Sequence, residues 1–171
     1  MTIPSRRLRA QLSMYVPRDD AFELEAIRLL VDPVQSRLIP AHVTLCRESE
    51  LAEISEIELA RRLAASHLKP ITLRFGPAEV FDGHGILLRC IEGEGEFQAL
   101  REHVLGSRKI MAQAPHITLA HPRNPKSPGN SLSNTAQLPE VHSFSFSMVC
   151  LIKQQEDEPW TVIQEFQLEC S

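Results

Sequence analysis

The sequence predicts an α+β fold with two pseudo-symmetric lobes, each made of antiparallel sheet with outer helices, on either side of a central cleft. Two observations predict this arrangement. Strand-like and helix-like segments alternate along the 171 residues, and one short sequence occurs twice, as HVTL at 42–45 and as HITL at 116–119. Two copies so far apart are too few and too widely spaced for a solenoid. We therefore expect residues 1–171 to form a single domain in which each lobe contributes one copy to the cleft.

The first elements expected are a strand, a helix and a second strand. Residues 8–16 alternate apolar and polar side chains, as a strand does, and residues 42–48 form a strand around the first copy. Between them, residues 19–31 carry apolar side chains at helical spacing, and Asp19 or Asp20 could cap this helix.

A long helix and a hairpin are expected next. Residues 50–68 predict the clearest helix, with one apolar face made of Leu51, Ile54, Ile57 and Leu63. Residues 71–81 and 85–92 predict paired strands, because Gly83-His84-Gly85 between them supplies turn geometry.

The second half repeats the pattern of helix and strand. Residues 94–106 predict a helix that ends at Gly106, and the second copy follows in its own strand. Residues 122–134 have the composition of a loop. Residues 142–154 predict a strand and residues 159–169 a last, antiparallel one; the first of these places on one face Phe144, Phe146 and Met148.

Composition and charge narrow the function classes. The chain is 43% hydrophobic and 23% charged, as in globular domains, and it has no apolar run near the ~20 residues of a membrane span. No apolar run follows the first arginines as a signal peptide requires, so we expect a cytoplasmic monomer without membrane or protein partners. A net charge of −4 argues against a broad basic face that wraps long nucleic acid, but it leaves room for a nucleotide or an RNA end.

The cysteines do not indicate a metal or redox site. No two of them form a close pair, which excludes zinc-ribbon and Cys-x-x-Cys patterns; they are Cys46, Cys90, Cys150 and Cys170. Without a secretion signal, free thiols are expected.

The repeated sequence carries the chemistry. Strand side chains alternate between faces, so His42 and Thr44 point one way while Val43 points into a core, and His116 and Thr118 share a face in the same manner. Two imidazoles and two hydroxyls then converge if the lobes face each other. A neutral imidazole can take a proton from water and an imidazolium can donate one to a leaving ribose oxygen, while hydroxyls bind phosphate oxygens. The pattern therefore favours phosphodiester cleavage that needs no metal or cofactor.

A single copy would carry little weight, because a histidine and a threonine are ordinary residues in a strand. Duplication changes this interpretation: chance predicts roughly 0.03 copies of His-x-Thr-Leu in a chain of this composition, and here there are two.

Both motifs resemble the signature of the two-histidine (2H) phosphoesterases, which include the 2′-5′ RNA ligase family and cyclic nucleotide phosphodiesterases. That signature is His-x-Thr/Ser-hydrophobic, once in each lobe of a bilobal α+β fold. The resemblance implies hydrolysis or ligation at 2′,3′-cyclic or 2′,5′ phosphate linkages without metal, with His42 as the acid and His116 as the base. Relatives often carry a basic residue just after the second motif, where this chain has Ala120 and His121.

Five further residues are candidates for binding substrate. Arg47 and Arg123 could bind phosphate, and His121 could take the missing basic role, although surface arginines are more often only solvated. Tyr15 and Trp160 could stack on a base, although most such aromatic residues pack in cores. A metal site is not predicted, because His121 lies an odd number of residues from His116 and faces away from it in a regular strand.

The predicted function is therefore hydrolysis of 2′,3′-cyclic phosphates on RNA ends or small nucleotides, with 2′-5′ RNA ligation as a related activity. Two alternatives stay open: a module that binds a nucleotide or RNA end without turnover, and an enzyme for a non-nucleotide phosphodiester. Histidine variants and the pH profile of kcat/KM would separate enzyme from binding module.

Overall fold

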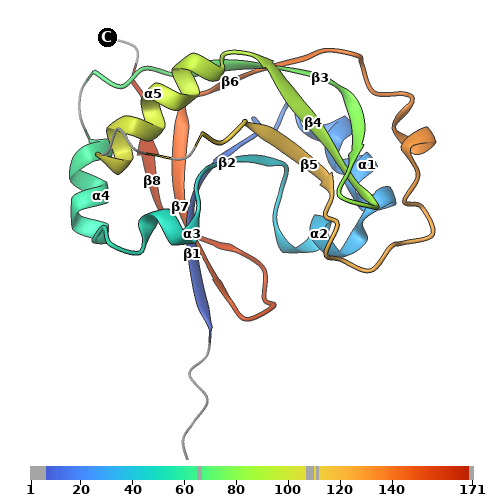
Figure 1. Ribbon diagram of the computed structural model, residues 1–171, viewed down its shortest axis with the longest axis horizontal. Coiled ribbons are helices and arrows are strands. Elements are labelled where there is room, and N and C mark those ends of the chain that lie inside the picture. The colour runs from blue at the N-terminus through green and yellow to red at the C-terminus, as the bar shows by residue number, and fades with distance from the viewer. Residues whose placement is uncertain (1–6, 65–66, 107–109, 111, 170–171) are drawn as a thin grey trace, which may run out of the picture.

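The fold consists of two four-stranded antiparallel sheets, as the sequence predicts (Figure 1). A computed structural model describes residues 7–64, 67–106, 110 and 112–169. Within them the strand orders are β2-β1-β7-β8 in one sheet and β5-β4-β3-β6 in the other. The first sheet draws its strands from both ends of the chain, and the second from the middle.

The strands of the first sheet are β1 (Leu8–Tyr15), β2 (His42–Cys46), β7 (Met148–Gln155) and β8 (Thr161–Gln167). Those of the second are β3 (Ile71–Phe81), β4 (Gly85–Glu92), β5 (His116–Ala120) and β6 (His142–Phe146). The hairpin of β3 and β4 has the predicted bounds. Its turn places Asp82 at φ 48° and Gly83 at φ 90°, and glycine adopts this left-handed region without strain.

The helices are α1 (Phe22–Val31), α2 (Pro33–Leu38), α3 (Glu48–Leu51), α4 (Glu56–Leu63), α5 (Glu94–Leu105) and the 3₁₀ turn η1 (Leu132–Thr135). In sequence, helix α1 lies between β1 and β2, which both belong to the first sheet, but it packs against β5 of the second sheet. Helix α5 packs against both β2 and β3. The helices are thus shared between the lobes, and one apolar core cluster includes residues of both sheets.

Helix α1 begins later than predicted. Its N-cap is Ala21, which makes no side-chain cap, and the expected caps at Asp19 and Asp20 are wrong. Residues 17–20 form a turn instead, in which the backbone N–H of Asp20 donates to the carbonyl of Pro17 at 2.9 Å.

The long helix predicted at 50–68 is wrong. The chain forms α3, breaks at 52–55 and restarts as α4, where the Ser55 hydroxyl accepts a hydrogen bond from the backbone N–H of Glu58 at 3.1 Å. The break rotates the second segment, so that Ile57 is 84% exposed and Leu59 is buried instead. Ser55 caps the start of a new helix inside the predicted range, so the apolar spacing there does not belong to one continuous helix.

The strand predicted at 142–154 is two strands. Ser147 separates β6 from β7, and the chain crosses there from the second sheet to the first. Alternation holds in β6, where Phe144 and Phe146 are buried, but it ends in β7, where residues 149–152 are all buried because both faces of the strand are covered.

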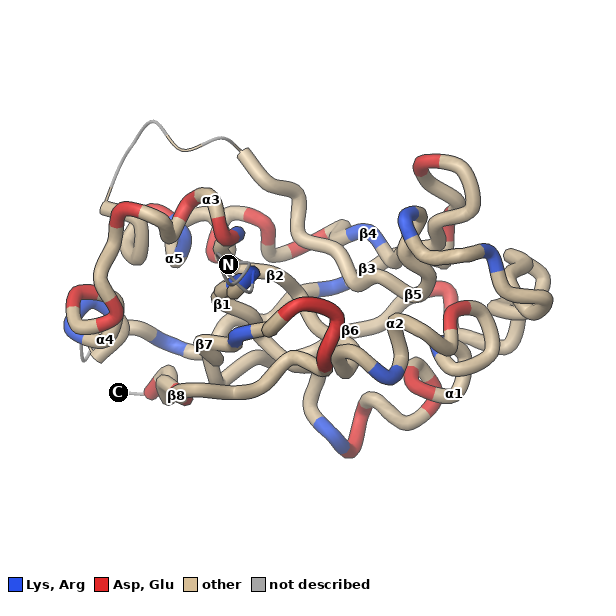
Figure 2. Tube along the Cα trace, turned by 90° about the horizontal axis from the view of Figure 1, so that it is seen from below, with Lys and Arg blue, Asp and Glu red and all other residues tan. Residues whose placement is uncertain are grey.

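Figure 2 shows basic and acidic residues interspersed along the backbone trace of both sheets and the helices. None of the helices in the described residues combines the length and hydrophobicity needed to cross a membrane.

Candidate active site

The two repeated motifs lie side by side. Strand β2 is an edge of the first sheet, β5 is an edge of the second, and the two strands contact each other. The predicted alternation is present in both: the hydrophobic residues of the motifs are fully buried, and the partly exposed residues are His42, Thr44, His116 and Thr118.

All four polar residues line one cleft of about 540 Å³. All three predicted basic residues also line it, namely Arg47, His121 and Arg123. Trp160 lies on its wall as well. The same cleft is lined by residues that the motif did not indicate, among them Arg9, Gln11, Glu48, Gln113, Asn124 and Asp157.

Both imidazoles are held in the same way. The Nδ1 atom of His42 lies 2.8 Å from the carbonyl oxygen of Pro40, and Nδ1 of His116 lies 3.0 Å from that of Ala114. A carbonyl only accepts hydrogen bonds, so Nδ1 carries the proton in each neutral ring. Nε2 is then the nitrogen that each ring offers to the cleft, as an acceptor when neutral and a donor when charged.

Burial favours the neutral form of both rings. The pKa of His42 is lowered from 6.5 to about 4: desolvation is the largest cause, the Pro40 carbonyl opposes it, and the nearby charges of Arg28 and His116 act in the same direction as desolvation. Desolvation also lowers the pKa of His116, and Arg47 and Arg89 act in the same direction. A neutral ring can accept a proton as a base. A ring that acts as an acid must first take up a proton from solvent, which an anionic substrate favours because its charge raises the pKa of the ring.

The two predicted arginines are available to an anion. Both Arg47 and Arg123 are exposed, and within the described residues neither guanidinium forms an ion pair. Desolvation is the main cause that lowers the pKa of both His116 and His121; the nearby charge of Arg47 also lowers that of His116, and the charge of Arg123 that of His121. The backbone N–H of Arg123 donates to Nδ1 of His121 at 3.1 Å, which leaves the proton of that neutral ring on Nε2.

The two aromatic candidates are placed differently. Tyr15 is not among the residues that line the cleft; its ring packs edge-on against His42, with centroids 6.2 Å apart. Trp160 does line the cleft, but the guanidinium of Arg9 lies over its ring at 5.2 Å from the centroid. Arg9 is held there by Gln154, which accepts from it at 3.2 Å, and by Glu48.

Three cysteines, Cys46, Cys90 and Cys150, are free thiols, and Cys170 lies outside the described residues. In the part of the chain that is described, no three His, Cys, Asp or Glu side chains are grouped so that they could hold a metal ion.

Comparison with known proteins identifies the family. The sequence of residues 16–158 matches the 2'-5' RNA ligase superfamily. The chain belongs to this superfamily. Its members are 2H phosphoesterases, so the family inferred from the two motifs is confirmed.

Solved structures share the fold of this superfamily member. Escherichia coli LigT complexed with ATP aligns with a TM-score of 0.59 at 18% identity, over 95% of this chain and 98% of that one. LigT complexed with 3'-AMP aligns with a TM-score of 0.55 at 14% identity over the same shares. TT0787 of Thermus thermophilus aligns with a TM-score of 0.56 at 22% identity, over 94% and 97%. No curated protein matches the chain.

Two buried arginines that contact the motif strands of this superfamily member were not predicted from the sequence. Arg28 in α1 and Arg101 in α5 are 0% and 1% exposed, and each donates to a backbone carbonyl of a motif strand. A signal was present: AIRLLV at 26–31 and ALREHV at 99–104 both read Ala-Ile/Leu-Arg-x-x-Val. The two arginines precede the motif histidines by nearly the same length of chain, so the internal repeat extends beyond the short motif first noticed.

Proposed function

We propose that the protein is a phosphoesterase that hydrolyses 2′,3′-cyclic phosphates on RNA ends or small nucleotides, by a route that requires no metal, and that residues 1–171 act as one two-lobed unit. One observation carries the proposal. Two imidazoles line one cleft, each bound through Nδ1 to a carbonyl two residues earlier, and each has a threonine beside it on the same strand face.

The chemistry follows from these groups. Water attacks phosphorus in line with the ribose oxygen that leaves. The base takes the proton from water at its Nε2, the phosphorus–oxygen bond to ribose breaks, and the acid gives its proton to the departing oxygen. Thr44 and Thr118 donate to the non-bridging oxygens, where negative charge gathers. If the 5′-hydroxyl of a second RNA end attacks in place of water, and the 3′ ribose oxygen leaves and takes the proton from the acid, the same groups would join two ends through a 2′,5′ linkage.

The division of roles is part of the proposal. The family resemblance implies that His42 is the acid and His116 the base. The bound cyclic phosphate carries a negative charge, which raises the pKa of an adjacent imidazole and so charges the acid. Arg47 and Arg123, exposed at the cleft, are the proposed phosphate ligands, with His121 beside them. Trp160, carrying Arg9, is proposed to contact the nucleoside.

The structural neighbours support a nucleotide as ligand, since LigT is described in complexes with 3'-AMP and with ATP. At 14% and 18% identity this likeness shows the fold alone. The base preference therefore has to be measured on this chain.

The test is a panel of 2′,3′-cyclic mononucleotides and RNAs with 2′,3′-cyclic ends, with products identified by phosphorus NMR. We expect turnover that persists in EDTA, and losses of about 10²-fold or more in kcat for His42→Asn and His116→Asn. His67→Asn is the matched control, because His67 is exposed and outside the cleft. Binding of these compounds without turnover would refute the proposal in favour of a binding module, and cleavage confined to non-nucleotide diesters would refute its substrate class.

A further inference from the structure

One ion pair in α1 contacts the backbone on both sides of the cleft. The Arg28 guanidinium donates from Nη2 to the carbonyl of Ile39 at 2.7 Å and from Nε to the carbonyl of Thr118 at 3.2 Å. Its Nη1 lies 2.7 Å from Oε2 of Glu25, one turn earlier in the same helix. A single buried side chain therefore joins the segment before the first motif to the second motif itself.

The carboxylate of this pair fixes the same segment. Oε1 of Glu25 accepts from the backbone N–H of Ala41 at 2.5 Å. Residues 39 and 41 flank Pro40, whose carbonyl binds Nδ1 of His42. The Glu25–Arg28 pair thus holds in place the carbonyl that orients the first imidazole.

The repeat-related arginine in α5 makes the reciprocal contacts. Arg101 donates to the carbonyl of Leu45 in the first motif, and its Nη2 lies 2.5 Å from Oε1 of Glu50. It also donates to the side-chain oxygen of Gln113 at 3.2 Å, and the Gln113 amide donates to the carbonyl of Thr44 at 2.9 Å.

Gln113 directly precedes Ala114, whose carbonyl binds Nδ1 of His116. Each arginine therefore contacts one motif strand and the segment that leads into the other.

We propose that Arg28 and Arg101 are positioning residues that set the distance and orientation between the two His-Thr pairs. Stability alone does not explain them, because an apolar side chain in place of a buried ion pair is often as stabilising. A guanidinium presents several donors in a rigid plane, which lets one residue fix two backbone segments at once. The inference rests on the proposed function only where turnover is its readout.

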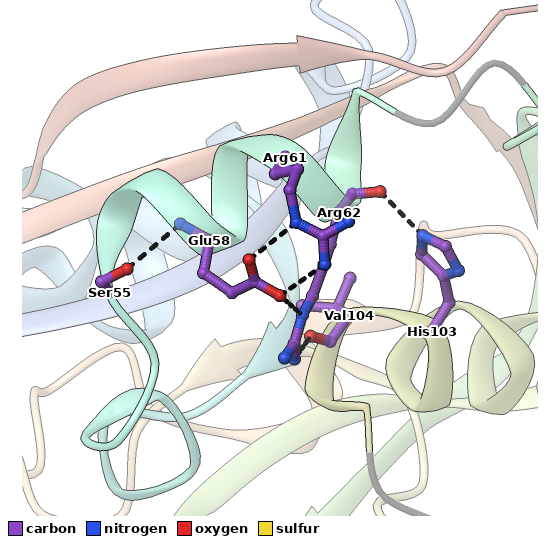
Figure 3. A network of polar contacts seen from close by, with 6 residues as sticks. All are labelled: Ser55, Glu58, Arg61, Arg62, His103 and Val104. Atoms are coloured by element: carbon purple, nitrogen blue, oxygen red, sulfur yellow. Dashed lines mark hydrogen bonds and ion pairs between the residues drawn. The ribbon is translucent and has the colours of Figure 1, made fainter.

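A matched control lies elsewhere in the fold. Arg62 in α4 forms an ion pair with Glu58, with Nε 2.7 Å from Oε1, and donates to the backbone carbonyl of Val104 in α5 at 2.6 Å (Figure 3). It makes the same kinds of contact as Arg28, but it joins two helices and touches neither motif.

The experiment compares Arg28→Lys, Arg101→Lys and Arg62→Lys. Lysine keeps the positive charge but offers one nitrogen, so it cannot span the acceptors that a guanidinium reaches. Misplacement of reacting groups by about 1 Å can lower a rate by about 10²-fold. We expect kcat for a 2′,3′-cyclic nucleotide to fall about tenfold or more in the first two variants, with KM changed by about threefold at most because the exposed phosphate ligands remain. Arg62→Lys should retain kcat within about twofold.

Urea unfolding of each variant gives the loss of stability against which the rates are compared. If Arg62→Lys lowers kcat as much as Arg28→Lys at equal stability, or if both motif variants keep kcat, the proposal fails. If Arg28→Lys does not fold, the comparison of kcat between Arg101→Lys and Arg62→Lys tests the proposal instead.

A second readout does not depend on turnover. The ring ¹⁵N and ¹H resonances of His42 and His116 report on the orientation and tautomer of each imidazole. We expect both rings to shift in Arg28→Lys and Arg101→Lys and neither in Arg62→Lys; unchanged rings would overturn the positioning role. A wild-type protein that cleaves no cyclic phosphate would refute the proposed function, while the ring shifts would still decide the positioning.

Discussion

His42 should make the stability of the folded protein depend on pH in a defined window. Its pKa is lowered from 6.5 to about 4, chiefly by desolvation. Between these values the unfolded chain binds a proton at this residue and the folded chain does not. The contribution of neutral, buried His42 to the free energy of unfolding is therefore fully present above about pH 6.5. It is lost progressively as the pH falls toward about 4.

The size of the effect follows from the same two values. The difference of about 2.5 pH units corresponds to about 3 kcal/mol at about 1.4 kcal/mol per unit. Contact of the ring with water in the open cleft reduces this figure, so about 3 kcal/mol is the upper value. Even half of it is a large share of the roughly 5–15 kcal/mol by which domains are typically stable.

The assay is urea unfolding of the wild type and of His42→Asn at a series of pH values from about 7.5 to about 4.5. Asparagine does not titrate, and its amide can still donate to the Pro40 carbonyl. Other acidic and basic groups are common to both proteins, so they cancel in the difference between the two free energies of unfolding. We expect the wild type to lose stability relative to the variant as the pH falls. A difference that stays constant across the range would refute the reasoning.

Three further predictions concern single contacts. Ser55→Ala should cost about 1 kcal/mol in urea unfolding through loss of the α4 cap, and an unchanged midpoint would contradict that assignment. Asp32 is buried and accepts from three donors, one of them the backbone N–H of His121 at 2.9 Å. Asp32→Ala should cost about 3 kcal/mol and speed hydrogen exchange at that amide; slow exchange would show that another group holds the loop. Gly93→Ala should cost about 2–4 kcal/mol in thermal unfolding, because φ is 97° and an added Cβ would lie 2.4 Å from a backbone oxygen. Gly83→Ala, with φ 90° and open space, should cost only about 1 kcal/mol, and equal costs would exclude the steric argument.

The parts of the fold that the sequence predicted are those governed by local rules. The β3–β4 hairpin has its expected bounds because its turn contains Gly83, which adopts a left-handed backbone at φ 90° without strain. The end of α5 at Gly106, where φ is 64°, has the same cause. The motif residues were predicted because two strands with the same alternation place the same residues on the polar face.

The features that were not predicted from the sequence are those that depend on which other strands and helices each segment packs against. The alternation in β6 and the apolar run in β7 fit one continuous strand as well as two strands in different sheets, so only the fold reveals the crossing at Ser147. The packing of α1 against a strand of the other sheet has no local signature either. Arg28 and Arg101 were missed because arginine is mostly a surface residue, and their burial depends on acceptors that come from distant strands.

The passage of the chain back into its first sheet after β6 has a consequence for cleavage of the polypeptide. A nick in the loop between β5 and β6 would leave either piece with strands in both sheets: β1 to β5 on one side of the cut, β6 to β8 on the other. Neither fragment could then keep a complete lobe, and the pieces would have to stay together for either imidazole to keep its surroundings. The candidate active site therefore depends on strands from both parts of the chain and is not divided between two separable halves.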